Sequence, residues 1–170
     1  MQEKIPSAEE LYGAEKQLVK LLTEKGLKVT TAESITGGLI SKLITDVPGA
    51  SEVFECGICS YSNRIKNGLL GVSTETLDAY SEYSSECACE MAAGARKLSG
   101  ADVGISATGI AGPGGGTEEK PVGTVYVGIS TENNTKAYEL RLGEYGSREG
   151  IRKASASYAV YLALEAVREL

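Results

Sequence analysis

The sequence alternates short apolar segments with stretches of helical periodicity, and this alternation constrains the fold more than any other feature. Apolar residues recur at helical spacing in 11–26 and 39–44. Shorter helical stretches follow at 63–70, from 74, and from 84 or 85 to 98. Between them, segments 27–32, 53–61 and 103–108 have the composition of strands. Strands that alternate with helices form parallel sheets covered by helices, so this part of the chain predicts such a sheet.

The last third of the chain departs from this alternation. Segments 122–131 and 135–142 both have strand character, and the polar residues 132–134 between them predict a hairpin. Ser147 then caps a final apolar helix. The sequence therefore predicts one domain over 1–170, of the α/β class, with three α/β/α layers around a mixed sheet. The sheet is expected to be parallel where helices cross over and antiparallel at the hairpin.

Charge and composition exclude several classes of function. Lys and Arg number 17 against 23 Asp and Glu, a net charge of −6, so no basic field exists to hold a nucleic-acid backbone. The chain contains 0 histidines. Ser-His-Asp and Cys-His catalysis and histidine-ligated zinc are therefore impossible, and a nucleophile in this chain must use another base.

The ends and the cysteines indicate the compartment. No apolar run reaches the roughly 20 residues of a membrane span, and the N-terminus has no apolar signal core, so we expect a cytoplasmic protein that does not bind a membrane.

The four cysteines form the pairs Cys56-x-x-Cys59 and Cys87-x-Cys89. An odd separation on a strand points the first two apart, and the second pair is about 200° apart on a helix. We expect free, buried thiols in a reducing compartment and no metal site. A capping box, Ser7-Ala-Glu-Glu10, precedes the first helix.

Three loops follow predicted strands, where ligands bind in open α/β sheets. The first loop, 32–38, contains Ser34 as a candidate nucleophile. The unpaired amides at the start of the next helix would attract an anion, with Thr36, Gly37 and Gly38 as substrate contacts. The alternative is that Ser34 or Thr36 only caps that helix.

The second loop brings together a phenol, an amide, a guanidinium and an amine. Lys66 and Tyr61 are the candidate bases for Ser34, and Asn63 is a candidate substrate contact. Lowering a lysine pKa from about 10.4 to about 7.5 takes roughly 4 kcal/mol of desolvation or nearby positive charge, which Arg64 would help to supply. The alternative is that Lys66 and Arg64 are solvated surface residues.

The third loop, 109–121, is the most glycine-rich part of the chain, and it is neither a Walker A sequence nor a dinucleotide fingerprint. Its glycines permit close approach of backbone to a ligand. The candidate amide donors to an oxyanion or phosphate are Thr108, Gly109 and Ile110. Lys120 would close over the phosphate, and Arg148 would pair with it. The alternative is a plain flexible surface loop.

Three motifs in this order resemble the CinA C-terminal domain family. They are Ala32-Glu-Ser-Ile-Thr-Gly-Gly38, Tyr61-Ser-Asn-Arg-Ile-Lys66, and the stretch from Ala107 to Thr124. The resemblance covers essentially the whole chain and implies that family's fold. The sequence departs from the motifs of the family at two places. Ile35 stands where the family commonly has cysteine, and Gly114-Gly115 stands where an acidic or other residue often interrupts the glycines.

The resemblance implies a nicotinamide-nucleotide amidase, which converts nicotinamide mononucleotide and water to nicotinic acid mononucleotide and ammonia in NAD salvage. By motif, Ser34 resembles the nucleophile and Lys66 its base. Tyr61, Thr108 and Arg148 resemble supporting residues of the active site. The family also implies a small-molecule nucleotide as partner, no cofactor and a homo-oligomer. The chain begins at the first helix of the amidase unit and so resembles the stand-alone form. The alternative function is a non-catalytic nucleotide-binding module that keeps the pocket without turnover.

Overall fold

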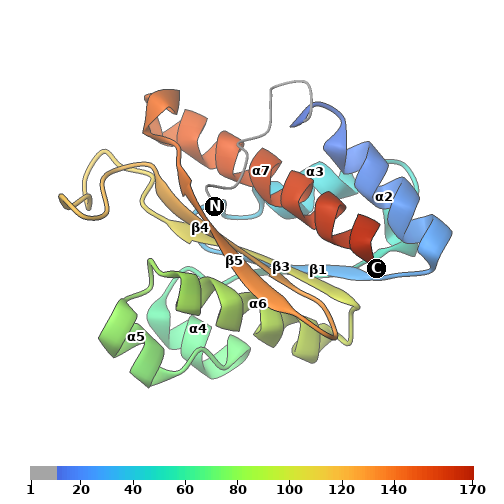
Figure 1. Ribbon diagram of the computed structural model, residues 1–170, viewed down its shortest axis with the longest axis horizontal. Helices are drawn as coiled ribbons and strands as arrows, with labels where there is room; N and C mark the ends of the chain where they lie inside the picture. The colour runs from blue at the N-terminus through green and yellow to red at the C-terminus, as the bar shows by residue number, and fades with distance from the viewer. Residues whose placement is uncertain (1–10) are drawn as a thin grey trace.

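A mixed five-stranded sheet lies between two layers of helices (Figure 1). The computed structural model describes residues 11–170, and the capping box at 7–10 lies outside them. The strands are β1 (Val29–Glu33), β2 (Phe54–Cys59), β3 (Val103–Gly109), β4 (Thr124–Ser130) and β5 (Thr135–Arg141). The helices are α2 (Ala14–Lys25), α3 (Leu39–Thr45), α4 (Asn63–Leu70), α5 (Thr74–Tyr80), α6 (Ser85–Ser99) and α7 (Arg148–Glu169). Two short 3₁₀ turns are η1 (Ala50–Glu52) and η2 (Gly143–Tyr145).

The strand order is β2-β1-β3-β4-β5. Strand β1 is parallel to both β2 and β3, whereas β4 is antiparallel to β3 and β5. The predicted mixed sheet with its C-terminal hairpin is therefore confirmed. The chain leaves β1 toward β2 and leaves β3 toward β4, in opposite directions. Neighbouring strands with diverging connections open a crevice at their carboxyl ends, where α/β proteins bind ligands.

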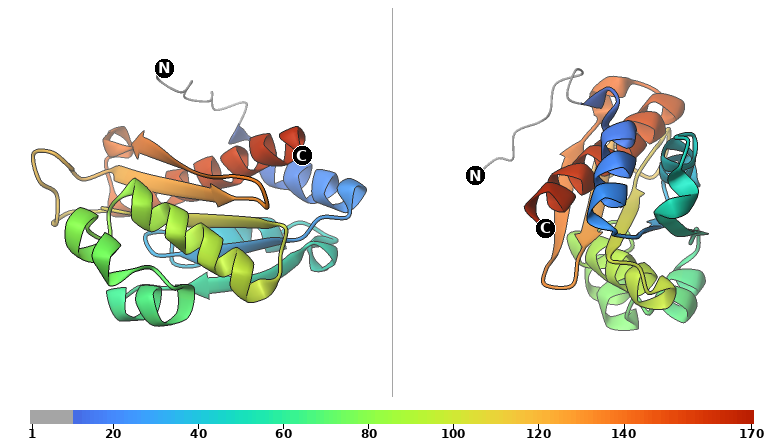
Figure 2. Two further views of the ribbon diagram at one scale, coloured as in Figure 1. Left: turned by 60° about the horizontal axis from the view of Figure 1, so that its bottom comes forward. Right: turned by 90° about the vertical axis from the view of Figure 1, so that its right-hand side faces the viewer.

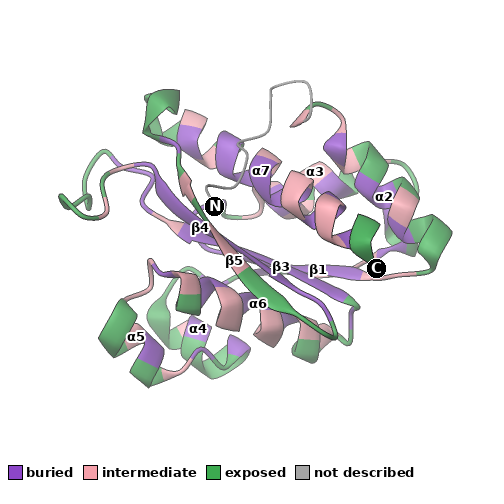
Figure 3. Ribbon diagram, in the orientation of Figure 1, coloured by how far each residue is buried: buried purple, intermediate pink, exposed green. Residues whose placement is uncertain are grey.

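The helices divide between the two faces of the sheet, which confirms the three-layer prediction. Helices α2, α3 and α7 cover one face, and α4, α5 and α6 cover the other (Figures 1 and 2). Strands β1 and β4 are buried along their whole length (Figure 3), because helices exclude water from both sides. The edge strand β5 is mostly exposed or half-buried.

Helix α6 lies unusually close to the sheet because glycines face it. A Cβ atom on Gly104 would lie 2.2 Å from the carbonyl oxygen of Ala92, and one on Gly128 would lie 2.3 Å from that of Ala88. Ser106 donates a hydrogen bond of 2.6 Å to the same Ala88 oxygen. These contacts fix the position of α6 against strands β3 and β4.

A buried carboxylate joins β1 to α3. Glu33 ends β1 and is 0% exposed. One carboxylate oxygen accepts hydrogen bonds from the amides of Gly38 at 2.9 Å and Ile40 at 3.0 Å. The other accepts from the Ser41 amide at 2.8 Å and the Ser41 hydroxyl at 2.6 Å. A carboxylate at a helix N-terminus satisfies the unpaired amides and the positive end of the helix dipole, so Glu33 holds the intervening loop in one conformation.

We predict that Glu33→Ala lowers the free energy of unfolding by about 3 kcal/mol, because buried amides lose a charged acceptor. Urea unfolding followed by circular dichroism measures this. The matched control is Glu55→Ala on β2, where an exposed carboxylate lies 3.8 Å from Lys28 and should contribute less than about 1 kcal/mol. Equal losses in the two variants would contradict the structural role of Glu33.

Candidate active site

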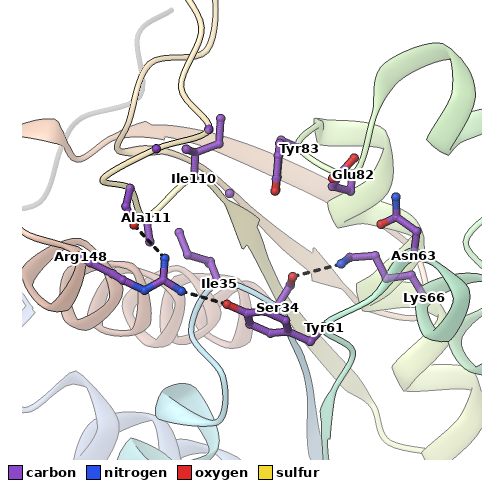
Figure 4. A pocket seen from close by; sticks show the side chains of 14 residues that line it. Ser34, Ile35, Tyr61, Asn63, Lys66, Glu82, Tyr83, Ile110, Ala111 and Arg148 are labelled. Atoms are coloured by element: carbon purple, nitrogen blue, oxygen red, sulfur yellow. Dashed lines mark hydrogen bonds between the residues drawn. The ribbon is translucent and has the colours of Figure 1, made fainter.

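A cavity opens at the crevice between β1 and β3, and Figure 4 shows the residues that line it. The segments after β1, β2 and β3 all contribute, because these three strands are parallel and their carboxyl ends meet at one edge. The segment between α5 and α6 and the start of α7 complete the wall. The side chains labelled in the figure are Ser34, Ile35, Tyr61, Asn63, Lys66, Glu82, Tyr83, Ile110, Ala111 and Arg148.

Ser34 and Lys66 meet at the floor of this cavity. The Lys66 Nζ atom donates a hydrogen bond of 3.0 Å to the Ser34 Oγ atom (Figure 4). Ser34 is 8% exposed and Lys66 is 1% exposed. The alternatives in which Ser34 caps a helix and Lys66 is a solvated surface residue are wrong. The N-cap of α3 is Gly38, without a side-chain cap, and α4 directs Lys66 inward.

Burial lowers the pKa of Lys66 below its ordinary value, while the neighbouring Cys87 and Glu82 act in the opposite direction. Desolvation disfavours the ammonium form. Arg64, which we expected to lower this pKa, is exposed and is not among the causes of the shift. A buried amine with a lowered pKa, within hydrogen-bond reach of a hydroxyl, has the geometry of a general base and its nucleophile.

The amides at the start of α3 are not available to a ligand, contrary to the expectation for this loop. Gly38 and Ile40 donate to Glu33 inside the protein. Thr36 is fully buried and its hydroxyl has no hydrogen-bond partner. Arg152 of α7 donates to the carbonyl oxygens of Ile35 at 2.9 Å and Thr36 at 3.0 Å. Thr36, Gly37 and Gly38 therefore shape the loop but do not line the cavity.

Tyr61 and Arg148 form one side of the cavity mouth. The Arg148 guanidinium donates to the Tyr61 hydroxyl at 2.9 Å and to the Gly112 carbonyl oxygen at 2.9 Å (Figure 4). It thus links α7, the segment after β2 and the glycine-rich loop. Tyr61 is 64% exposed, and Asn63, the first residue of α4, also lines the cavity.

The glycine-rich loop contributes backbone to the cavity through Gly109 and Ile110. A Cβ atom on Gly109 would lie 2.6 Å from the Thr124 carbonyl oxygen, so this residue must be glycine. The Ile110 amide, an expected oxyanion donor, instead donates to that Thr124 oxygen at 2.9 Å. Further along the loop, Ala111, Gly112, Gly114 and Gly115 also line the cavity.

Thr108 and Lys120 lie behind the wall of the cavity rather than in it. The Thr108 hydroxyl donates to the Glu82 carbonyl oxygen at 2.6 Å. The Lys120 ammonium donates to the carbonyl oxygens of Tyr83 at 2.7 Å and Tyr80 at 3.2 Å. The expectation that Lys120 closes over a phosphate is therefore not met in this structure, because backbone carbonyls hold its ammonium.

Sequence reasoning missed Glu82 and Tyr83, which line the cavity. They follow a helix rather than a strand, so the rule that ligands bind after strands does not find them. Arg152 was also missed, although its spacing of four residues from Arg148 places both on one face of α7. This spacing is a signal that the sequence does contain.

The cysteines and possible metal ligands add no second site. All four cysteines are free thiols, as the sequence predicts, but the predicted burial holds only for Cys87. Cys59 is exposed and Cys56 is half-buried, because strand β2 lies at the edge of the sheet, and Cys89 on α6 is also half-buried. Burial raises the pKa of Cys87 to about 11, so it stays neutral beside Lys66. Across residues 11–170, no cluster of three or more histidine, cysteine or acidic side chains is placed to hold a metal ion. No helix in this range is long and apolar enough to cross a membrane.

Comparison with known proteins identifies the family. The model of the CinA C-terminal domain matches residues 12–167. The chain belongs to the CinA C-terminal domain family. A relative from Caldanaerobacter subterraneus subsp. tengcongensis that carries a competence-damage inducible protein name is 51% identical over 145 residues, 85% of this chain and 35% of the relative. A CinA-like protein from Kosmotoga olearia is 47% identical over 157 residues, 89% of this chain and 38% of the relative. The chain thus spans about a third of the length of these curated relatives.

Solved CinA structures share the fold described above. The competence/damage inducible protein CihA from Agrobacterium tumefaciens is 38% identical, with a TM-score of 0.88 that covers 98% of this chain and 99% of the other. A CinA superfamily protein from Escherichia coli is 26% identical, with a TM-score of 0.87 that covers 97% and 95% of the two chains. The three-layer arrangement is therefore that of CinA proteins.

We predict that the stability of this CinA domain rises with pH through Lys66. At a pH below the lowered pKa of the folded state, Lys66 is charged in both the folded and the unfolded protein. The unfavourable burial of its ammonium then lowers the free energy of unfolding by its full amount. That cost is relieved as the pH rises toward the ordinary value of 10.5, because the unfolded chain then binds more protons than the folded one. Between the two pKa values the gain approaches about 1.4 kcal/mol per pH unit.

Lys66→Met removes the titrating group and keeps the apolar stem, so it serves as the reference. Urea unfolding of both proteins between pH 7 and pH 10 gives the difference in free energy of unfolding. We expect the free energy of unfolding of the wild type to rise relative to that of Lys66→Met as the pH rises. Parallel stability curves would show that the Lys66 pKa is not lowered in the folded protein.

Proposed function

We propose that the protein is a nicotinamide-nucleotide amidase that hydrolyses the carboxamide of nicotinamide mononucleotide, with Ser34 as nucleophile and Lys66 as base. The observation that carries the proposal is the 3.0 Å contact between a buried lysine amine and a serine hydroxyl on the floor of an open cavity. The chain contains 0 histidines. Of the two candidate bases, Lys66 is hydrogen-bonded to Ser34, whereas the Tyr61 hydroxyl accepts from Arg148, so Lys66 is the better base for this serine. Membership in the CinA family supports the choice of substrate.

The chemistry begins with neutral Lys66. As the Ser34 oxygen attacks the amide carbon, its proton passes to the Lys66 amine, and a tetrahedral intermediate forms. Amides of the glycine-rich loop are proposed to stabilise its oxyanion. The bond from carbon to nitrogen then breaks, and Lys66 returns the proton to the leaving ammonia. Water cleaves the resulting ester by the same route in reverse, which gives the acid and restores Ser34.

The opposite end of the substrate is assigned to Arg148. Its guanidinium lies at the cavity mouth, where Tyr61 and Gly112 fix its orientation. Arginine presents several donors in a plane and pairs well with phosphate. We therefore place the ribose phosphate at this end and the carboxamide at Ser34, with Asn63 beside Lys66 as a polar contact.

We predict that the wild type releases ammonia from nicotinamide mononucleotide, and that Ser34→Ala and Lys66→Met each lower kcat by roughly 10³-fold or more. Removing either member of a nucleophile and base pair has effects of this size. A coupled ammonia assay with and without EDTA measures the rates, and activity that persists in EDTA is expected. The matched control is Arg64→Met, because Arg64 is an exposed residue of α4 and should leave kcat nearly unchanged.

Near-normal turnover by Ser34→Ala would overturn the covalent route and favour direct attack by water. Binding of the nucleotide without release of ammonia by the wild type would favour a non-catalytic nucleotide-binding module. Calorimetric titration of the same proteins with the nucleotide separates these two outcomes.

A further inference from the structure

The cavity carries opposite charges at its two ends. Arg148 supplies a cation at the mouth, whereas Glu82 supplies a carboxylate on the wall that faces Ser34 and Lys66 (Figure 4). Tyr83 stands beside Glu82, with its hydroxyl end pointing into the cavity (Figure 4). Burial and the adjacent Glu82 raise the pKa of the Tyr83 hydroxyl, so this group stays neutral. The wall thus combines one anion with one neutral aromatic ring.

The segment that bears Glu82 and Tyr83 is held in place by its backbone. Thr108 donates to the Glu82 carbonyl oxygen at 2.6 Å, and Lys120 donates to the Tyr83 carbonyl oxygen at 2.7 Å. The Ser84 hydroxyl donates to the Ser81 carbonyl oxygen at 2.9 Å. Ser81 has a φ of 70°, a conformation that a non-glycine residue adopts only when its surroundings require it. These contacts fix the backbone of the segment, and the Glu82 and Tyr83 side chains line the cavity.

The charge of the Glu82 carboxylate is not paired with a basic side chain of residues 11–170. Within the described part of the chain, Glu82 takes part in no salt bridge. Glu82 interacts electrostatically with Lys66, whose pKa is lowered by burial. A partly buried carboxylate without a counter-ion is unfavourable, and it also opposes the loss of the Lys66 proton. A cationic ligand beside Glu82 would remove both penalties.

We propose that Glu82 selects a substrate with a positively charged ring next to its reacting amide, and that Tyr83 provides an aromatic surface for that ring. This inference rests on the proposed function, because it assumes that the amide lies at Ser34. The apolar side chains of Ile35 and Ile110 complete the surroundings of the ring. A flat cation between an aromatic face and a carboxylate is stabilised by both. The ligand class is therefore a cationic aromatic amide with an anionic group at its far end.

The test compares two ligands that differ mainly in ring charge. Oxidised nicotinamide mononucleotide has a cationic pyridinium ring, and its reduced form has an uncharged dihydropyridine ring with the same carboxamide and phosphate. Dissociation constants are measured by calorimetry on Ser34→Ala, which removes the proposed nucleophile and so prevents turnover. Glu82→Gln is added to this background. The matched control is Glu86→Gln, because Glu86 is an exposed acid in the first turn of α6 and does not line the cavity.

We expect Glu82→Gln to weaken binding of the oxidised form roughly tenfold, as for loss of one partner of a charge pair, and to change binding of the reduced form less than about twofold. Glu86→Gln should leave both within about twofold. Equal weakening of both forms, or unchanged binding of the oxidised form, would overturn the role of Glu82 while the amidase proposal stands if the wild type releases ammonia. Failure of both forms to bind, together with no release of ammonia, would overturn both proposals.

Discussion

The hydrogen bonds of the Glu33 carboxylate fix the loop that carries Ser34, and so they set the geometry of the site. The carboxylate is buried at the end of β1 and accepts hydrogen bonds from the first amides of α3. The strand, the loop and the helix are thereby joined as one rigid unit, and Ser34 is the residue that follows directly. Because an internal carboxylate uses these amides, the helix N-terminus serves the architecture of the loop and not the ligand.

The second constraint is the burial of Lys66. Helix α4 begins at Asn63 and lies against α6, and it carries the Lys66 side chain away from water. There the Lys66 amine donates a hydrogen bond to the Ser34 hydroxyl. The cost of removing an ammonium from water is what lowers its pKa. The same burial that costs stability thus favours the neutral amine that the proposed mechanism needs in a protein without histidine. Stability and chemistry are coupled through this one residue.

Segments away from Ser34 and Lys66 determine where the charged side chains lie around the cavity. Lys120 and Thr108 hold the backbone between α5 and α6, and Arg148 links α7 to the glycine-rich loop. These residues act on different walls, so the cavity receives a carboxylate at one end and a guanidinium at the other. A ligand with separated charges fits this distribution better than a neutral one.

The elements and their order could be predicted from local residue patterns, because strand composition and helical periodicity at 29–33, 39–45 and 103–109 are properties of short stretches of the chain. The sequence also located Ser34 and Lys66, since loops after parallel strands converge and the absence of histidine left few bases. Tertiary structure decided what each polar group contacts. Whether the amide of Gly38 meets a ligand or Glu33, and whether Lys120 meets a phosphate or a carbonyl, depends on packing between segments far apart in the chain. The place of Glu82 in the cavity wall has the same kind of cause. Glu82 lies just before α6, and Gly104 and Gly128 allow α6 to pack closely on the sheet, a contact that no local sequence pattern predicts.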